Sequence, residues 1–162
     1  MHLKVITQNE SPIKLELVKD YLRIDHDEED EIISTMLFAA IDYAEKFIRR
    51  SIIKKEYELI TKGNSIKLPN PPIIEVKSVT VDGEDVEFEF EEPNHLKIDN
   101  FGKVIVRYEA GYDELPKAIE QALLMLTSHY YENREIVIVG TSVIRIPFTV
   151  ESLLYPYKSG WF

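Results

Sequence analysis

The chain has 162 residues, of which 44% are hydrophobic and 30% are charged, so we expect one globular domain spanning residues 1–162. Its 19 basic and 29 acidic side chains give a formal net charge of −10, which argues against a surface built to neutralise nucleic-acid phosphates. The chain has no cysteine, no secretory signal and no apolar run of the ~18 residues that span a bilayer, which excludes disulfides and thiolate sites and predicts a soluble, intracellular protein without membrane contact.

The first predicted elements are two helices, which together occupy residues 14–50. An extended segment, residues 1–13, leads into them. Apolar side chains recur at helical spacing over residues 15–22, which predicts a first helix of about two turns. Asp27 is predicted to cap a second, long helix, because apolar residues then recur three and four positions apart until Arg50.

Residues 55–110 are predicted to form an antiparallel β region of five to seven short strands. Apolar residues alternate along short segments that turn residues separate. The Asp-Gly pair at 82–83 predicts a tight hairpin whose return strand covers residues 86–90. A second hairpin is predicted between residues 95–98 and 103–108.

A last long helix is predicted over residues 116–133, with Pro116 in the first helical position. A β-prone arm, residues 136–148, follows it. Residues 149–155 are predicted to form one helical turn, and an aromatic tail completes the C-terminal segment 136–162. This order of elements predicts an α+β fold, in which a helical bundle of a short and two long helices carries an inserted antiparallel β region.

The acidic run from Asp25 to Glu31 is the first candidate for chemistry, because spaced carboxylates beside His26 can bind a divalent cation. A calcium loop of the EF-hand kind needs a glycine at its sharp turn, and this run has none. A solvated, negatively charged start of the second helix explains the same residues. We therefore predict no metal site.

The remaining polar residues give no enzyme signature. His129 has Glu132 three residues away, which suits a general base and its orienting carboxylate, but a partly buried structural histidine is the favoured interpretation. The chain has no Gly-x-Ser-x-Gly turn and no phosphate-binding glycine loop. We predict no catalytic residue and no cofactor, and we do not expect an enzyme.

The C-terminal segment is the strongest candidate for binding another protein. Left exposed, its aromatic side chains would form a large apolar patch, so we expect them to dock within the subunit or on a neighbour. The predicted interaction residues are Leu153, Leu154, Tyr155, Tyr157, Trp161 and Phe162.

Several segments of the chain resemble the head–tail connector (adaptor) family of long-tailed bacteriophages. The most specific is Val-Lys-Asp-Tyr-Leu-Arg-Ile-Asp at residues 18–25. Similar segments lie at residues 27–33, 39–45, 72–83, 108–112, 115–116, 130–135 and 152–158, so the resemblance covers nearly the whole chain. The chain departs from the family pattern at Lys14, where a capping Ser or Thr is expected, and at Lys158, where arginine is usual.

The resemblance implies a structural virion protein. Members of this family form a homo-oligomeric ring that joins the portal protein of the phage head to a tail-side neck protein and leaves a channel through which DNA passes without specific binding. The resemblance places the protein at the head–tail junction of the virion, and in the host cytoplasm during assembly, and it carries no catalytic residues. An acidic subunit suits such a channel, because like charge opposes lasting contacts with phosphate.

Two other classes of function stay open at this point. A non-viral adaptor or regulator would bind a protein partner through the same aromatic end. A metal-dependent enzyme would use the carboxylates of residues 25–31.

Overall fold

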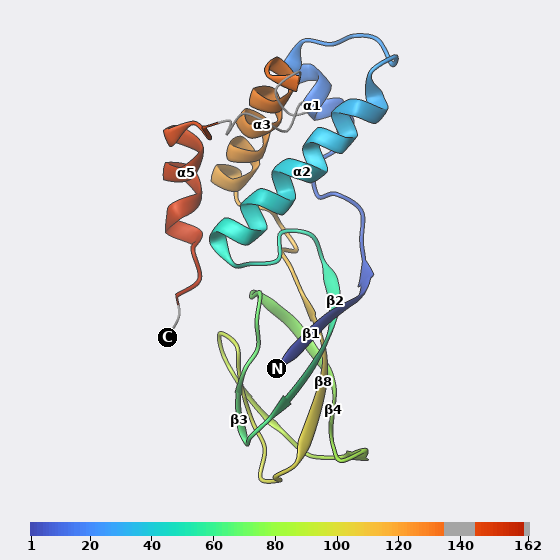
Figure 1. Cartoon of the computed structure of the whole chain (residues 1–162), viewed down its shortest axis with the longest axis vertical. Coiled ribbons are helices and arrows are strands. Elements are labelled where there is room, and N and C mark those ends of the chain that lie inside the picture. The colour runs from blue at the N-terminus through green and yellow to red at the C-terminus, as the bar shows by residue number, and fades with distance from the viewer. Residues whose placement is uncertain (135–144, 161–162) are drawn as a thin grey trace. The chain divides into compact units, whose positions relative to one another are not determined.

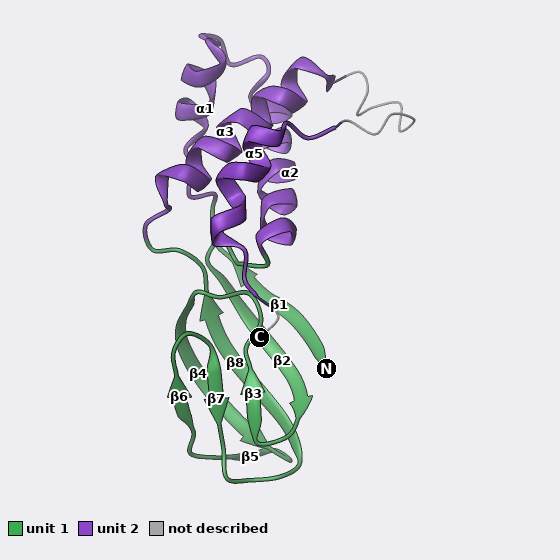
Figure 2. Ribbon diagram, turned by 90° about the vertical axis from the view of Figure 1, so that its left-hand side faces the viewer, with its two compact units in different colours: residues 1–10, 49–113, 161–162 green, residues 11–48, 114–160 purple. Residues whose placement is uncertain are grey.

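A computed structural model describes residues 1–134 and 145–160 of the chain (Figure 1). The residue contacts divide the chain into two compact units (Figure 2). Unit 1 contains residues 1–10 and 49–113, and unit 2 contains residues 11–48 and 114–160. Each unit is therefore assembled from segments far apart in the sequence, and the expectation of one domain over residues 1–162 stays a prediction.

Unit 2 is helical (Figure 2). Its described residues form the α-helices α1 (Leu15–Leu22), α2 (Asp30–Ile48), α3 (Lys117–Glu132) and α5 (Phe148–Leu154), and the 3-10 turn Tyr155–Tyr157. The three helices predicted from periodicity are present. The single turn predicted at 149–155 is a longer element, a seven-residue helix followed by the 3-10 turn.

The core of unit 2 lies between α2, α3 and α5. Side chains of α2 at helical spacing, such as Ile33 and Ile41, are at most 1% exposed. Helix α2 packs against α3, in which Ile119 and Leu126 are fully buried. Burying a side chain of this size is worth roughly 1.5–3 kcal/mol, so the apolar stripe predicted on each helix supplies the packing that holds the unit together.

The start of α2 differs from the prediction. The helix begins at Asp30, and Asp27 precedes it in a turn. The Asp27 carboxylate accepts a hydrogen bond from the ammonium of Lys19 in α1 at 2.6 Å, and this bond lowers the pKa of Asp27. Lys19 also lies 2.8 Å from the carboxylate of Asp30. The predicted cap was wrong because the acidic residues before α2 pair with a lysine of the preceding helix.

Unit 1 is a β structure. Its described strands are β1 (His2–Gln8), β2 (Lys55–Lys62), β3 (Ser65–Lys67), β4 (Ile73–Val81), β5 (Glu84–Asp85), β6 (Glu89–Glu91), β7 (His95–Lys97) and β8 (Lys103–Ala110). They form a five-stranded sheet in the order β1-β2-β8-β4-β5 and a three-stranded sheet in the order β3-β7-β6, and every pairing is antiparallel. Seven of these strands lie in the predicted β region. The eighth, β1, comes from the segment predicted only to be extended.

One apolar cluster joins the two sheets of unit 1. Leu59 of β2 and Val106 of β8 are direct cross-strand neighbours in the first sheet and are fully buried. Leu96 of β7, in the second sheet, is also fully buried in this cluster. The rings of Tyr57 and Tyr108 stack at 5.4 Å, so the aromatic pair fills the space between neighbouring strands.

The predicted strand partners were partly wrong. The turn at 82–83 is present, and Asp82 and Gly83 both have the positive φ that a tight hairpin requires. However, the returning chain pairs with β4 only through β5 and one further backbone hydrogen bond, from the amide of Val86 to the carbonyl of Val79. It then crosses to the second sheet as β6. The predicted hairpin of β7 with β8 does not form, because β7 pairs with β3 and β6 whereas β8 pairs with β2 and β4.

Gly111, at the end of β8, offers a test of this packing. Its φ is +138°, and a Cβ atom there would lie 2.7 Å from the Cα atom of Lys54 and 2.8 Å from the carbonyl oxygen of Ile53. Gly63 has a φ of +108°, but a Cβ atom there would meet no other atom within 4 Å. We expect Gly63→Ala to cost ~1–2 kcal/mol of unfolding free energy from backbone strain, and Gly111→Ala to cost roughly 1–3 kcal/mol more from the clash. Urea unfolding measures both, and equal losses would contradict this account.

Candidate docking surface

Two aromatic side chains stand out on the surface of unit 2. Phe148, the first residue of α5, is 82% exposed, and Tyr155, just after α5, is 67% exposed. Between them lies a hollow of about 580 Å³, which we call the α5 hollow. It is lined by Phe47, Phe148, Glu151, Ser152, Tyr155, Pro156 and Lys158. A hollow of this size with exposed rings at its rim is typical of a site that receives side chains of a partner.

The wall of the hollow is built from the end of α2, from α5 and from the segment after α5. Phe47 stacks on Tyr43, one turn earlier in α2, with ring centroids 6.0 Å apart. The ammonium of Lys158 lies 5.0 Å from the Phe47 centroid and 6.0 Å from that of Tyr155, within the range of cation–π attraction. The amide of Ser159 donates a 2.7 Å hydrogen bond to the carbonyl of Ile48, which fixes this segment against the end of α2.

A partly buried hydrogen bond joins α5 to α2. The Tyr43 hydroxyl donates to the Glu151 carboxylate at 3.2 Å. Burial, together with the negative charge of Glu151, raises the pKa of Tyr43 to about 12. The phenol therefore keeps its proton at neutral pH and remains a donor, so α2 and α5 are joined by a polar contact as well as by apolar packing.

The predicted interaction residues fall into four groups. Tyr155 is exposed and lines the α5 hollow, while Leu153 and Tyr157 are half-buried. Leu154 is fully buried and belongs to the core of unit 2, so it holds α5 in place and is not itself available to a partner. Trp161 and Phe162 lie outside the described residues, as do residues 136–144 of the predicted arm.

Of the seven described residues that line the hollow, only Tyr155 was a predicted interaction residue, so sequence reasoning missed six. It gave three of these six another role. Phe47 continues the apolar repeat of α2 and was assigned to the core, Phe148 was assigned to the arm, and Lys158 was noted only as a departure from the family pattern. An aromatic residue beside Pro147, where a helix can begin, was the available signal for Phe148.

The acidic turn before α2 makes contacts that its sequence does not show. The hydroxyl of Tyr131 donates to one Glu29 oxygen at 2.5 Å, and the guanidinium of Arg134 donates to the other at 2.6 Å. The hydrogen bond from Tyr131 first, and that from Arg134 second, lower the pKa of Glu29. The predicted solvated helix start was therefore incomplete, since Glu29 ties the turn to the end of α3. Within residues 1–134 and 145–160, no three metal-binding side chains converge.

His129 is half-buried in α3, and its ring lies 6.3 Å from that of Tyr130. Among the residues that the structure describes, its Nε2 atom has no hydrogen-bond partner, and no hydrogen bond joins it to Glu132. The geometry of an oriented general base is therefore missing from the described part of the chain.

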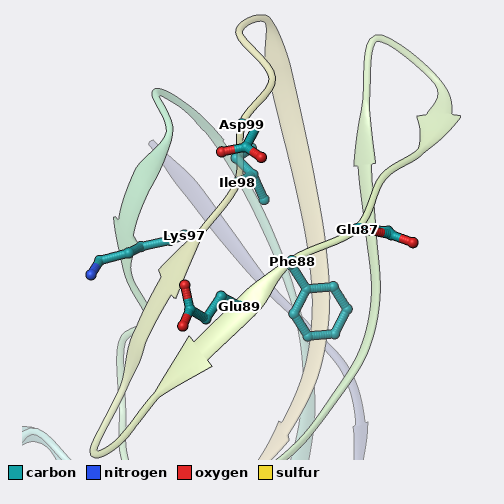
Figure 3. A pocket seen from close by; sticks show the side chains of 6 residues that line it. All are labelled: Glu87, Phe88, Glu89, Lys97, Ile98 and Asp99. Carbon is teal, nitrogen blue, oxygen red and sulfur yellow. The ribbon is translucent and has the colours of Figure 1, made fainter.

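A second hollow, in unit 1, is smaller and charged. It has a volume of about 230 Å³ and is lined by Glu87, Phe88, Glu89, Lys97, Ile98 and Asp99 (Figure 3). The side chains of Glu89 and Lys97 lie on one side of the strands, whereas Glu87 points to the other. Small-molecule sites are generally larger than this and mostly apolar, so the α5 hollow is the stronger candidate.

Comparison with known families identifies the type of protein. A family model described as head completion protein matches residues 13–158. The chain belongs to the head completion protein family. This membership confirms the resemblance to phage head–tail connectors and identifies the chain as a structural virion protein.

Solved structures of the same fold come from gene transfer agent (GTA) particles. The chain is similar to a chain in the virion of a native particle, with a TM-score of 0.81. It is also similar to a chain in the neck of an empty particle computed with C6 symmetry, with a TM-score of 0.79. A chain in the neck of a native particle computed with C12 symmetry matches with a TM-score of 0.74. In each case the two sequences are 20% identical, and the alignment covers 100% of this chain and 97% of the other. At this identity the likeness establishes the fold. No curated protein matches the chain.

The helices also bear on membrane association. None of the helices in the described ranges is both long and apolar enough to cross a bilayer.

The contacts of Glu29 predict a pH-dependent contribution to stability. Because the folded-state pKa is lowered, this contribution is fully present above the ordinary glutamate pKa of about 4.3 and is lost as the pH falls through the lower folded value. We expect Glu29→Gln to lower the melting temperature at pH 7 and this difference to shrink towards pH 3. Glu28→Gln, at an exposed neighbour, is the matched control and should change little at either pH. Equal effects at pH 7 and pH 3 would contradict the role of Glu29.

Leu153 and Leu154 are neighbours in α5 that differ in burial. We expect Leu154→Ala to lower the unfolding free energy by roughly 2–5 kcal/mol, because it removes a fully buried side chain. Leu153→Ala, at a half-buried position, should cost clearly less. Chemical denaturation of the two variants checks the difference, and a greater loss for Leu153→Ala would refute the assignment.

Proposed function

We propose that the protein forms a closed homo-oligomeric ring at the head–tail junction, between the portal protein of the head and a tail-side neck protein. The observation that carries this proposal is the family match over residues 13–158. The fold likeness to neck chains of GTA particles computed with C6 and C12 symmetry supports a ring, since chains in such positions are related by rotation. Ring closure requires two different patches on each subunit, one facing each neighbour.

A central channel for DNA completes the proposal. The net charge of −10 supports passage without specific binding, because a negative wall opposes lasting contacts with phosphate. The role is structural, with no catalytic residue and no cofactor. Subunits would assemble in the host cytoplasm and remain in the virion.

The α5 hollow is the proposed docking site for the portal protein. Phe148 and Tyr155 have the features of interface hot spots, since large aromatic rings bury much area at low entropic cost. Lys158 at the rim suits a carboxylate of the partner. Leu153, Tyr157, Trp161 and Phe162 stay in the proposal as further contacts, and Leu154 supports them from the core.

The alternatives weigh less. A non-viral adaptor would use the same aromatic surface, but membership of the head completion protein family favours the virion. An enzyme using residues 25–31 would need free carboxylates there, whereas Asp27 and Glu29 are held by Lys19, Tyr131 and Arg134.

Exposed aromatic residues provide a direct test of docking. We expect the double variant Phe148→Ser, Tyr155→Ser to keep its fold, because both side chains are mostly exposed, and to lose binding to purified portal rings. Phe101→Ser is the matched control, since Phe101 is 76% exposed in unit 1 and should be dispensable. Co-sedimentation with portal rings measures binding, and circular dichroism checks the fold. Undiminished binding by the double variant would refute this docking site.

A further inference from the structure

The five-stranded sheet of unit 1 ends in two open edges. β1 pairs only with β2, and β4 pairs with β5 only at Thr80 and Val81. Within the described residues, the outer edge of β4 over residues 73–78 therefore has no partner strand. An open edge presents unpaired backbone N–H and C=O groups, which can extend the sheet into another chain.

β1 has little to hold it in place apart from its pairing with β2. Six of its seven residues are exposed, and Leu3 alone is half-buried. Val5 is 46% exposed and Ile6 is 40% exposed, although both are apolar. A second strand on the outer edge of β1 would bury these side chains and pair its free backbone groups.

The two edges carry opposite charges on one face of the sheet. Lys4 of β1 lies opposite Glu58, which in turn lies opposite Arg107 and bonds to it at 3.0 Å. Glu75 of β4 lies on the same face, opposite Glu109. Lys77 also lies on this face of β4, where it pairs with Glu56 and Glu109. Among the described residues, neither Lys4 nor Glu75 makes an ion pair.

The other face is apolar at both edges. Val5, Tyr57, Tyr108 and Val76 are successive cross-strand neighbours from β1 to β4. The row begins with the exposed Val5 and ends with the half-buried Val76. Each edge therefore offers an apolar side chain on one face and a charge on the other.

We infer that β1 of one copy pairs with β4 of the next copy, so that the sheets of neighbouring subunits join head to tail. This inference rests on the proposed ring and names one of its subunit contacts. β1 and β4 run antiparallel within the sheet, and a rotation from one copy to the next nearly preserves strand direction, so the new pairing is also antiparallel. In this antiparallel register, Lys4 lies opposite Glu75 of the neighbouring copy. Val5 then lies opposite the exposed Ile74 of that copy, with Val76 as its diagonal neighbour.

The alternative pairing of like edges is disfavoured. Two β1 strands in antiparallel contact centred on Lys4 would bring two ammonium groups together. The register also shifts at Ile6 in β1 and at Ile74 and Lys77 in β4. Such bulges add twist and confine regular pairing to a short stretch, which limits the strands that can pair with each edge.

The absence of cysteine makes disulfide trapping a clean test. We would place Lys4→Cys in the same chain as a second cysteine, scanned through positions 74, 75 and 76. Two strands separate β1 from β4 within a chain, a distance of ~14 Å, so a disulfide can form only between chains. On oxidation we expect a ladder of dimers, trimers and higher species on a non-reducing gel, while the Lys4→Cys chain alone gives at most a low yield of dimers.

The outcomes separate this inference from the proposed ring. Rings of the unmodified protein in electron micrographs, without a ladder at any scanned position, would overturn the sheet contact and leave the ring standing. A high yield of dimers from Lys4→Cys alone would mean that like edges pair, which also overturns it. Neither rings nor a ladder would overturn both.

A substitution that adds a charge to the edge strand β1 provides a second test. We expect Val5→Lys to lower the yield of rings about tenfold, because a lysine on an edge strand opposes pairing, with no change in melting temperature. Leu17→Lys is the matched control, since Leu17 is an apolar residue of unit 2 that is 39% exposed. Equal ring yields for the two variants would count against the sheet contact.

Discussion

The α5 hollow depends on the burial of two side chains, Val150 and Leu154, in the core of unit 2. A helix of seven residues is too short to be stable alone, because nucleation costs more than so few hydrogen bonds return. It forms here because both side chains are fully buried. The Tyr43–Glu151 hydrogen bond then fixes its position against α2. Core packing therefore places Phe148 and Tyr155 on the surface, where a partner can reach them.

The two units offer different kinds of contact. Unit 2 carries an apolar hollow with aromatic rims, which suits the side chains of an unlike partner. Unit 1 carries two open sheet edges whose charges without an ion-pair partner, Lys4 and Glu75, are opposite in sign. A subunit of a closed ring that also binds the next component of a virion needs both kinds: complementary patches for its neighbours and a separate one for its partner.

Several acidic side chains of unit 2 are held by hydrogen bonds or ion pairs with residues of other elements. Glu29 is held by Tyr131 and Arg134, more than a hundred residues along the chain, and Asp27 is held by Lys19. These bonds fasten the turn before α2 to α1 and to the end of α3. The segments that carry the family resemblance around residues 18–33 and at residues 130–134 are thus joined in space, which gives their shared pattern a structural reason.

The sequence by itself determined the helices, most strands and the family, because these follow from local patterns: apolar spacing in α2 and α3, alternation in β2 and β8, and the connector-like segment at 18–25. Only the tertiary structure decided which strands pair, since the alternation of apolar residues is the same whichever sheet a strand joins. For this reason the predicted pairing of β7 with β8 was wrong. The tertiary structure also decided that Leu154 is core, that Phe47 and Phe148 line a hollow, and that Glu29 is bound. Each depends on contacts between residues far apart in the chain, which local periodicity does not encode.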